Sequence, residues 1–259
     1  MFIKKTRGFF VFCFFLSMIV GLLSLEAAEQ DEAIMGLHPQ LQEKARLFHS
    51  LHQGEELLIL PNAWDALSAK IFEQEGAKAI ATTSAGMAAT FGYADGQKFP
   101  KELLFVMVDR IVKSVSVPVT VDLEAGFGDT VEEICETVSS ILKIGAVGIN
   151  IEDADPKRPG HLFSIAEQTE KIRAIKDLAS KLNVPLFVNA RTDVFWLNLG
   201  AREERLPETL ARIQAYQEAG AEVSLFQVLL SLIQSLKLLK QSKYPLTYLQ
   251  EPGLETWLH

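Results

Sequence analysis

Two carboxylates stand two residues apart where an apolar run gives way to glycine. Asp122 and Glu124 follow the run VPVT-Val121 and precede Gly126. In parallel α/β proteins ligands bind at the carboxyl ends of strands, and side chains at i and i+2 of a strand point to one side. Both carboxylates can therefore face one site, where hard oxygen ligands favour Mg²⁺ over Zn²⁺. The alternative interpretation is a solvated loop with two ordinary acids.

Further polar residues follow the other apolar runs of the chain. Taken singly, each has an ordinary explanation, such as a helix cap or a surface ion pair. Taken together, they indicate a site built from several strand ends. The residues are Asn62, Trp64, Asp65, Thr83, Ser84, Ala85, Gly86, Glu152, Asp153, Asn189, Arg191 and Asp193.

The residue types in this set suit the binding of a small anion through a cation. Asp122, Glu124 and Glu152 would repel one another in a buried site and raise one another's pKa, so they need a cation, and we expect Mg²⁺. Arg191 offers a planar fork for a carboxylate or phosphonate. Thr83, Ser84 and the glycine after them can add hydroxyl and backbone N–H donors. Such a site fits a small 2-oxo acid whose developing enolate is stabilised by the cation.

Composition excludes several other functions. The formal charge of -8 and the lack of a basic stripe argue against nucleic acid as a partner. The chain of 259 residues suits one large domain, within the size range of a barrel. Of the two cysteines, Cys13 lies in an apolar leader and Cys135 has helical spacing with apolar neighbours, so neither a disulfide framework nor a cysteine metal cluster is expected.

Residues 1–28 differ in character from the rest of the chain. Basic residues precede an uncharged apolar stretch that ends at Glu26-Ala27-Ala28. This pattern is typical of a signal peptide, and its length also allows a membrane anchor and hence membrane contact. A third interpretation is that translation begins at Met35. The protein is then expected in the cytoplasm, whereas with residues 1–28 it is expected to be anchored or exported.

The remaining chain, 29–259, alternates helical and apolar segments. A helix is expected over 38–53, and Gly76, Gly145 and Gly220 stand where helices would stop. Because the predicted strands are apolar throughout and each is followed by a helix, a parallel sheet covered by helices is favoured. Strands are predicted at 56–60, 79–83, 117–122, 147–152, 184–190, 222–227 and 244–249, and helices at 66–75, 101–115, 130–144, 165–182, 206–219 and 230–240.

This pattern predicts an α/β fold of the (β/α)₈ TIM-barrel type. The competing fold is an open doubly wound sheet, but no Gly-x-Gly-x-x-Gly turn follows the first strand, which weakens a dinucleotide-binding interpretation. Only seven strands are apparent, and an eighth is missing after 244–249. An incomplete barrel exposes two strand edges, so we expect a partner chain in a homo-oligomer to complete it, or else a shortened and inactive relative. A disrupted reading frame is a further hypothesis.

Four segments resemble the isocitrate lyase and phosphoenolpyruvate mutase superfamily. The likeness spans roughly 45 to 221, and it implies an α/β barrel, Mg²⁺ dependence, and making or breaking a C–C or P–C bond next to a 2-oxo acid enolate. The segments, in order, are LPNAWDALSAKIFEQEGAKAIATTSAGMAATFGYAD, VDLEAGFGD, GINIEDADPKRPGH and NARTDVF.

The resemblance also implies roles for individual residues. Asp122 and Glu124 would belong to the metal shell, and Glu152 would hold metal-bound water. Asp95 would lie in a flexible gating segment, and Arg191 would bind the substrate anion. The pocket for the oxo acid would be lined by Thr83, Ser84 and Ala85.

One departure from the family pattern bears on the reaction. Isocitrate and methylisocitrate lyases carry a proton-transfer cysteine in the loop after the fourth strand, where this chain has Pro159. Proline cannot exchange a proton, so isocitrate lyase chemistry through that position is not expected. His161 in the same loop is the candidate acid or base, although a lone loop histidine is more often a bystander. The Lys-Thr-Asn/Ser signature of the phosphonopyruvate branch is missing too.

The sequence therefore predicts a Mg²⁺-dependent lyase-type enzyme that cleaves a C–C bond in a small 2-oxo or 2-hydroxy dicarboxylate. The alternatives are a phosphonopyruvate hydrolase or phosphoenolpyruvate mutase, and an inactive remnant. The predicted catalytic residues are Asp122, Glu152, Arg191 and His161. Whichever reaction applies, the expected partner is a small 2-oxo acid or phosphonate.

Overall fold

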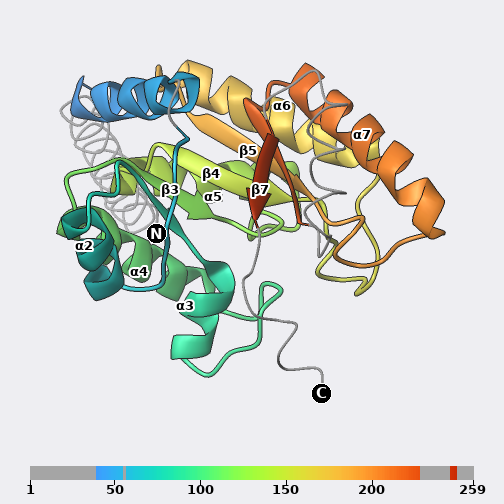
Figure 1. Ribbon diagram of the computed structural model, residues 1–259, viewed down its shortest axis with the longest axis horizontal. Coiled ribbons are helices and arrows are strands. Elements are labelled where there is room, and N and C mark those ends of the chain that lie inside the picture. The colour runs from blue at the N-terminus through green and yellow to red at the C-terminus, as the bar shows by residue number, and fades with distance from the viewer. Residues whose placement is uncertain (1–38, 55–56, 228–245, 250–259) are drawn as a thin grey trace, which may run out of the picture. The chain divides into compact units, whose positions relative to one another are not determined.

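The computed structural model describes residues 39–54, 57–227 and 246–249 (Figure 1). The predicted leader, residues 1–28, and the predicted helix at 230–240 lie outside these ranges. Contacts divide the chain into the units Met1–Gln40 and Leu41–His259, and the second carries the sheet. Among the described helices, none combines the length and the apolar character needed to cross a membrane.

Seven strands form one parallel sheet in which each strand pairs with its neighbours in sequence. This order is the one expected of a (β/α)₈ barrel, so the predicted fold class is confirmed. In the described residues the first and last strands are the two edges of the sheet, and no eighth strand is seen. The strands are β1 (Asn62–Ala63), β2 (Ile80–Thr82), β3 (Val119–Asp122), β4 (Gly148–Glu152), β5 (Phe187–Thr192), β6 (Val223–Gln227) and β7 (Leu246–Leu249).

Helices connect the strands (Figure 1), and each of α2, α4, α5, α6 and α7 packs against the next of these helices. A helix over residues 39–53 precedes β1, and its Phe48 packs edge-on against Phe187 of β5. The other helices are α2 (Ala66–Gln74), α3 (Ser84–Thr90), α4 (Lys101–Ser114), α5 (Val131–Ile144), α6 (Ile165–Lys181) and α7 (Arg202–Glu218).

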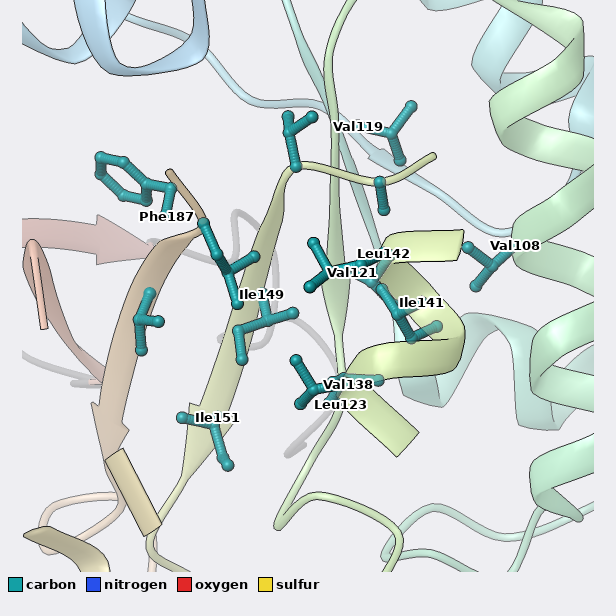
Figure 2. Close-up of a cluster of buried hydrophobic side chains, with 14 of the residues drawn as sticks. Val108, Val119, Val121, Leu123, Val138, Ile141, Leu142, Ile149, Ile151 and Phe187 are labelled. Carbon is teal, nitrogen blue, oxygen red and sulfur yellow. The ribbon is translucent and has the colours of Figure 1, made fainter. Parts of the chain in front are cut away.

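The apolar core lies between the strands and the helices that cover them. Figure 2 shows Val121 and Ile149 gathered with Val138 and Ile141 of α5, and all four are fully buried. Because side chains alternate along a strand, burial of these positions turns the intervening ones to the other side of the sheet. Asp122 and Glu152 belong to that second set.

Helix α5 shows how local sequence fixes the elements. The hydroxyl of Thr130 accepts a hydrogen bond from the backbone N of Glu133 at 3.2 Å, and the Glu133 carboxylate reaches back to the backbone N of Thr130 at 3.3 Å. This capping box starts the helix. Gly145 ends it with φ at +108°, a left-handed conformation in which glycine carries no steric penalty. The predicted stop at Gly145 is thus confirmed, as are those at Gly76 and Gly220.

The predicted boundaries differ most from the structure at the start of two elements. The first strand is Asn62–Ala63 rather than 56–60, and the preceding Leu57 and Ile59 are 88% and 72% exposed. Pairing with β2 begins only at Pro61, whose carbonyl accepts from the backbone N of Ala81 at 3.0 Å. The last described helix starts at Arg202 rather than 206, because the Glu204 side chain satisfies the backbone N of residue 201 and extends the helix before Pro207.

Candidate active site

Two rows of polar side chains lie at the carboxyl ends of β3, β4 and β5, one across all three strands and one across β4 and β5. In the first row the register aligns Asp122 with Asn150 and Asn150 with Asn189. In the second row it aligns Glu152 with Arg191. Each row takes one residue from each successive strand, so the backbone pairing itself sets the spacing of the site. The structure thus brings together three of the four predicted catalytic residues, Asp122, Glu152 and Arg191.

Asp122 is held in one orientation by hydrogen bonds to both carboxylate oxygens. Its Oδ2 accepts from the hydroxyl of Ser84 at 2.7 Å and from the backbone N of Ser84 at 3.2 Å. Its Oδ1 accepts from Nδ2 of Asn150 at 3.0 Å, and Asn150 accepts in turn from Nδ2 of Asn189 at 3.0 Å. The Asp122 carboxylate is therefore held in one direction by Ser84 and by Asn150, and Asn150 is itself held by Asn189.

The turn that carries Thr83, Ser84 and Ala85 begins helix α3, which was not predicted. Thr83 caps this helix by accepting from the backbone N of Gly86 at 3.1 Å, so its hydroxyl already has a local partner. Ser84 is bound to Asp122, whereas Ala85 is exposed. A Cβ on Gly86 would lie 2.6 Å from Cγ2 of Thr83, so the tight approach here requires glycine.

Glu124 is 3% exposed and faces the segment that links α3 and α4. Its carboxylate accepts a hydrogen bond from the backbone N of Gln97, whose own side-chain oxygen accepts from the backbone N of Phe127 at 2.6 Å. Burial, followed by the charges of Asp95 and Asp122, raises the pKa of Glu124 to about 8. Asp95 itself is exposed, and it acts on this site through its charge.

The backbone around Glu124 is strained at three residues. Glu124, Gln97 and Phe127 have φ values of +48°, +57° and +52°, in the left-handed region that side chains other than glycine rarely adopt. Such conformations persist only where surrounding contacts enforce them, and they cluster at functional sites. The hydrogen bonds that join these three residues supply the contacts.

Arg191 lies between two carboxylates. Its Nη1 is 3.3 Å from Oε2 of Glu152, and Asp193 accepts from its Nε at 2.6 Å and from its Nη2 at 3.2 Å. Burial raises the pKa of Glu152 well above its ordinary value, although Arg191 opposes this effect. Burial also works against the charge of Arg191, but Glu152 and Asp193 raise its pKa overall and keep it protonated.

The excess of carboxylates fits a bound cation. Asp122, Glu124 and Glu152 lie near Arg191 and Asp193, and burial, together with the charges of neighbouring acids, raises the pKa of both glutamates. Within the described residues, no three side chains of His, Cys, Asp or Glu lie close enough together to hold one metal ion. Mg²⁺ is commonly held by only one or two carboxylates, with water and substrate oxygens completing the shell. The donor set therefore fits Mg²⁺, while the three-carboxylate shell stays a prediction.

His161 lies apart from these residues in the loop between β4 and α6. The loop is a small hairpin closed by the bridge between Ala154 and Leu162, and His161 is exposed. Its Nδ1 is 3.4 Å from the carbonyl oxygen of Pro159, and in the described residues no hydrogen bond or ion pair joins it to the strand-end carboxylates. Its proposed catalytic role therefore gains no support from geometry.

The two cations of this loop are paired with nearby acids. Nζ of Lys157 is 2.7 Å from Oδ1 of Asp129, and Nε of Arg158 is 2.6 Å from Oδ2 of Asp155. The first pair joins the loop after β4 to the loop after β3. Arg191, by contrast, directly contacts Glu152 and Asp193 at the strand ends.

Asn150 and Gln97 were missed as site residues from the sequence, whereas Asn189 was among the predicted strand-end residues. For Asn150 a signal existed, because it stands two residues before Glu152, a predicted site residue on the same strand. For Gln97 the sequence offered no such signal, because its contact with Glu124 depends on how a connecting segment folds back.

The parallel sheet defines a barrel protein of the (β/α)₈ class, and the carboxylate and arginine rows lie at the carboxyl ends of its strands, where ligands bind in this class. Residues 48–257 match the family described as phosphoenolpyruvate phosphomutase, and the chain belongs to this family, within the isocitrate lyase and phosphoenolpyruvate mutase superfamily. The superfamily comprises lyases and mutases of small carboxylates and phosphonates.

Similar proteins include members with different reactions. The chain is 31% identical over 190 residues to 2-methylisocitrate lyase of Escherichia coli, a match that covers 71% of this chain and 62% of the relative. A solved structure from Burkholderia cenocepacia J2315 with a provisional phosphonomutase designation is 38% identical, with a TM-score of 0.75 over 82% of this chain and 87% of that one. A phosphonopyruvate hydrolase solved with oxalate and Mg²⁺ is 26% identical, with a TM-score of 0.72 over 80% and 71%.

Proposed function

We propose that this protein is a Mg²⁺-dependent lyase-type enzyme that cleaves a C–C bond in a small 2-oxo or 2-hydroxy dicarboxylate through an enolate. The observation that carries the proposal is the joint placement of Asp122, Glu152 and Arg191 on three adjacent strand ends. Membership in a superfamily of lyases and mutases supports it, as does the similarity to 2-methylisocitrate lyase.

Each of these residues has a part that its geometry suits. The Arg191 side chain is 15% exposed and is fixed by Asp193, so its free N–H groups are ready to bind a substrate carboxylate without reorganisation. Glu152 has a raised pKa and can hold a proton at its carboxylate during the reaction. Asp122, oriented by Ser84 and Asn150, would hold Mg²⁺ directly or through water. The cation would supply positive charge where the enolate oxygen develops.

Cleavage of a P–C bond is the second candidate. The similarity to the phosphonomutase-type structure at 38% identity and to a phosphonopyruvate hydrolase favours it. Arg191 would bind a phosphonate as readily as a carboxylate, because both present two oxygens to the fork. Pro159, which stands where the lyases carry a proton-transfer cysteine, also keeps this alternative open.

Product analysis separates the two candidates. Purified protein is incubated with Mg²⁺ and a panel of 2-oxo and 2-hydroxy dicarboxylates and phosphonopyruvate, and the products are identified by mass spectrometry and a phosphate assay. Carbon-only products, such as a 2-oxo acid with a shorter carboxylate, support the lyase. Phosphate release from phosphonopyruvate supports the alternative, and an absence of both turnover and oxalate binding contradicts an enzymatic function.

A further inference from the structure

A second buried polar cluster lies directly behind Arg191. Asp153 follows Glu152 at the end of β4 and is 0% exposed. Its Oδ2 accepts hydrogen bonds from the hydroxyl of Tyr216 at 2.6 Å and from Nη1 of Arg212 at 3.0 Å. Arg212 and Tyr216 stand four residues apart on α7, so both side chains leave the same face of the helix. The cluster therefore joins α7 to the strand ends.

Asp153 also contacts Asp193 and Arg191, the second of which is the proposed anion-binding residue. Its Oδ1 accepts from the backbone N of Asp193 at 2.9 Å, and its own backbone N donates to the carbonyl oxygen of Arg191 at 3.2 Å. The Asp193 carboxylate then accepts two hydrogen bonds from the Arg191 guanidinium. A continuous series of hydrogen bonds thus runs from α7 to that guanidinium.

Charge explains why Asp153 needs both partners on α7. A fully buried carboxylate is stable only when it is paired and hydrogen-bonded, and Arg212 supplies the positive charge. Arg212 is itself fixed by donating to the carbonyl oxygen of Phe163 at 2.8 Å. Burial and the charge of Asp153 raise the pKa of Tyr216, so its hydroxyl remains a donor. Removal of either partner would free Asp153 to rotate away from the Asp193 backbone.

We propose that Tyr216 and Arg212 are positioning residues that fix, through Asp153 and Asp193, the orientation in which Arg191 meets a substrate anion. An arginine side chain has five N–H donors. Asp193 accepts hydrogen bonds from Nε and Nη2, and Glu152 lies beside Nη1. The direction of the remaining N–H donors therefore depends on the Asp193 contact. The substrate part of this inference rests on the proposed function, whereas the orientation of Arg191 does not.

The first test is the variant Tyr216→Phe, which removes one hydroxyl and keeps the ring. Loss of a hydrogen bond to a charged group is expected to raise KM, or the Kd for oxalate, about tenfold, with kcat changed less than about threefold. Mg²⁺ binding should stay unchanged. Arg212→Lys keeps the charge and should fall between the wild-type protein and Arg212→Met, which would show that positioning rather than packing is affected.

The matched control is Thr209→Val on the same helix. Thr209 is fully buried, and in the described residues its hydroxyl has no hydrogen-bond partner. Its removal leaves no buried group without a partner, so KM should stay within about twofold of wild type. An equal rise in KM for Thr209→Val and Tyr216→Phe would indicate general loosening of α7 and would overturn the proposal.

A second readout does not depend on catalysis. The Nε–H of Arg191 gives a nitrogen-15 NMR signal that is assigned by its loss in Arg191→Lys. We expect this signal to shift or broaden in Tyr216→Phe and to remain in place in Thr209→Val. If the wild-type protein neither binds oxalate nor turns over, the proposed function fails, and this signal still decides the positioning role. An unchanged Arg191 signal in folded Tyr216→Phe refutes the positioning role. If Tyr216→Phe does not fold, an unchanged signal in Arg212→Lys refutes it instead.

Discussion

Uncharged side chains orient the carboxylate of Asp122. Ser84 donates to one of its oxygens and Asn150 to the other, and Asn150 is held by Asn189. Neutral donors orient a carboxylate without cancelling its charge, which leaves the charge free to act on a ligand. The paired acids Asp153 and Asp193 differ in this respect, because Arg212 and Arg191 neutralise them. We therefore distinguish Asp122, an acid whose charge can act on a ligand, from Asp153 and Asp193, which are paired within the protein.

The variant Asp122→Asn tests that distinction. The side-chain amides of Asn150 and Asn189 can turn over to accept the new N–H donor, so the fold should persist with a modest fall in melting temperature. Loss of the charge is expected to lower kcat/KM by about 100-fold or more, as with other preorganised electrostatic groups. Steady-state kinetics and thermal unfolding measure the two effects.

Asp129→Asn is the control for this variant, because Asp129 is an exposed acid in the same segment that pairs with Lys157. It removes an equal charge from outside the polar rows. Equal losses of activity in the two variants would contradict the role given to Asp122, and so would full activity in Asp122→Asn.

Lys171 provides a test of stability that does not involve the active site. It is 5% exposed, its Nζ lies 3.3 Å from the centre of the Phe163 ring, and in the described residues it has no hydrogen-bond partner. Burial lowers its pKa from 10.5 to about 8, although Asp153 and other acids oppose the shift. Below pH 8 the folded protein therefore carries the cost of a buried charge.

The sign of the pH effect follows from proton binding. Between about pH 8 and 10.5 the unfolded chain holds more protons at Lys171 than the folded one, so the free energy of unfolding rises with pH in this window. Lys171→Met removes that contribution. We expect the stability of the variant relative to wild type to fall by about 1 to 3 kcal/mol as pH rises from 8 to 10.5, measured by urea unfolding. A pH-independent difference would contradict the shift.

Helix ends and strand ends are the elements that place the site residues. The capping box of α5 fixes the end of the segment that leaves β3 past Glu124, and the Thr83 cap of α3 presents Ser84 to Asp122. Only one of these two caps could be predicted from the sequence. The Thr130 to Glu133 spacing is a standard helix start, whereas the seven-residue helix α3 contains glycine and small residues that give little periodic signal.

Thr130→Ala tests the contribution of the α5 cap. Loss of the Thr130 side-chain acceptor leaves the backbone N of Glu133 without its partner, and the expected loss of stability is about 1 kcal/mol. Ser140→Ala within the same helix is the comparison, and it is expected to change stability by less than about 0.5 kcal/mol. Denaturant unfolding of both variants measures the difference. Equal effects would show that the cap is not what stabilises α5.

The fold was predictable from the sequence because apolar strands and glycine stops repeat in a regular order. The polar rows of the candidate site were predictable in part, since Asp122, Glu152 and Arg191 occupy strand ends. The contacts of Glu124 with Gln97, and of Asp153 with Tyr216, were not predictable. They join segments far apart in sequence through side-chain lengths and helix rotations, which no local pattern encodes.

Ligand binding should register in the stability of the whole protein. A ligand that binds only the folded state stabilises it by about 2.7 kcal/mol at a hundredfold excess over its Kd. We therefore expect Mg²⁺ and oxalate together to raise the melting temperature, and a chelator to abolish the rise. Because Asp122 is the proposed metal residue, Asp122→Asn should show no rise, while Asp129→Asn should match wild type. A rise with oxalate that persists without Mg²⁺ would contradict metal dependence.

The rows across β3, β4 and β5 also link the site to the order of folding. Asp122, Asn150 and Arg191 come from three separate strands, and a register slip of one residue would turn any one of them to the opposite face. Oxalate binding can therefore return during refolding only after all three strands have paired correctly. The delay between recovery of the helical signal and recovery of oxalate binding would then measure how long the three strands take to pair in the correct register.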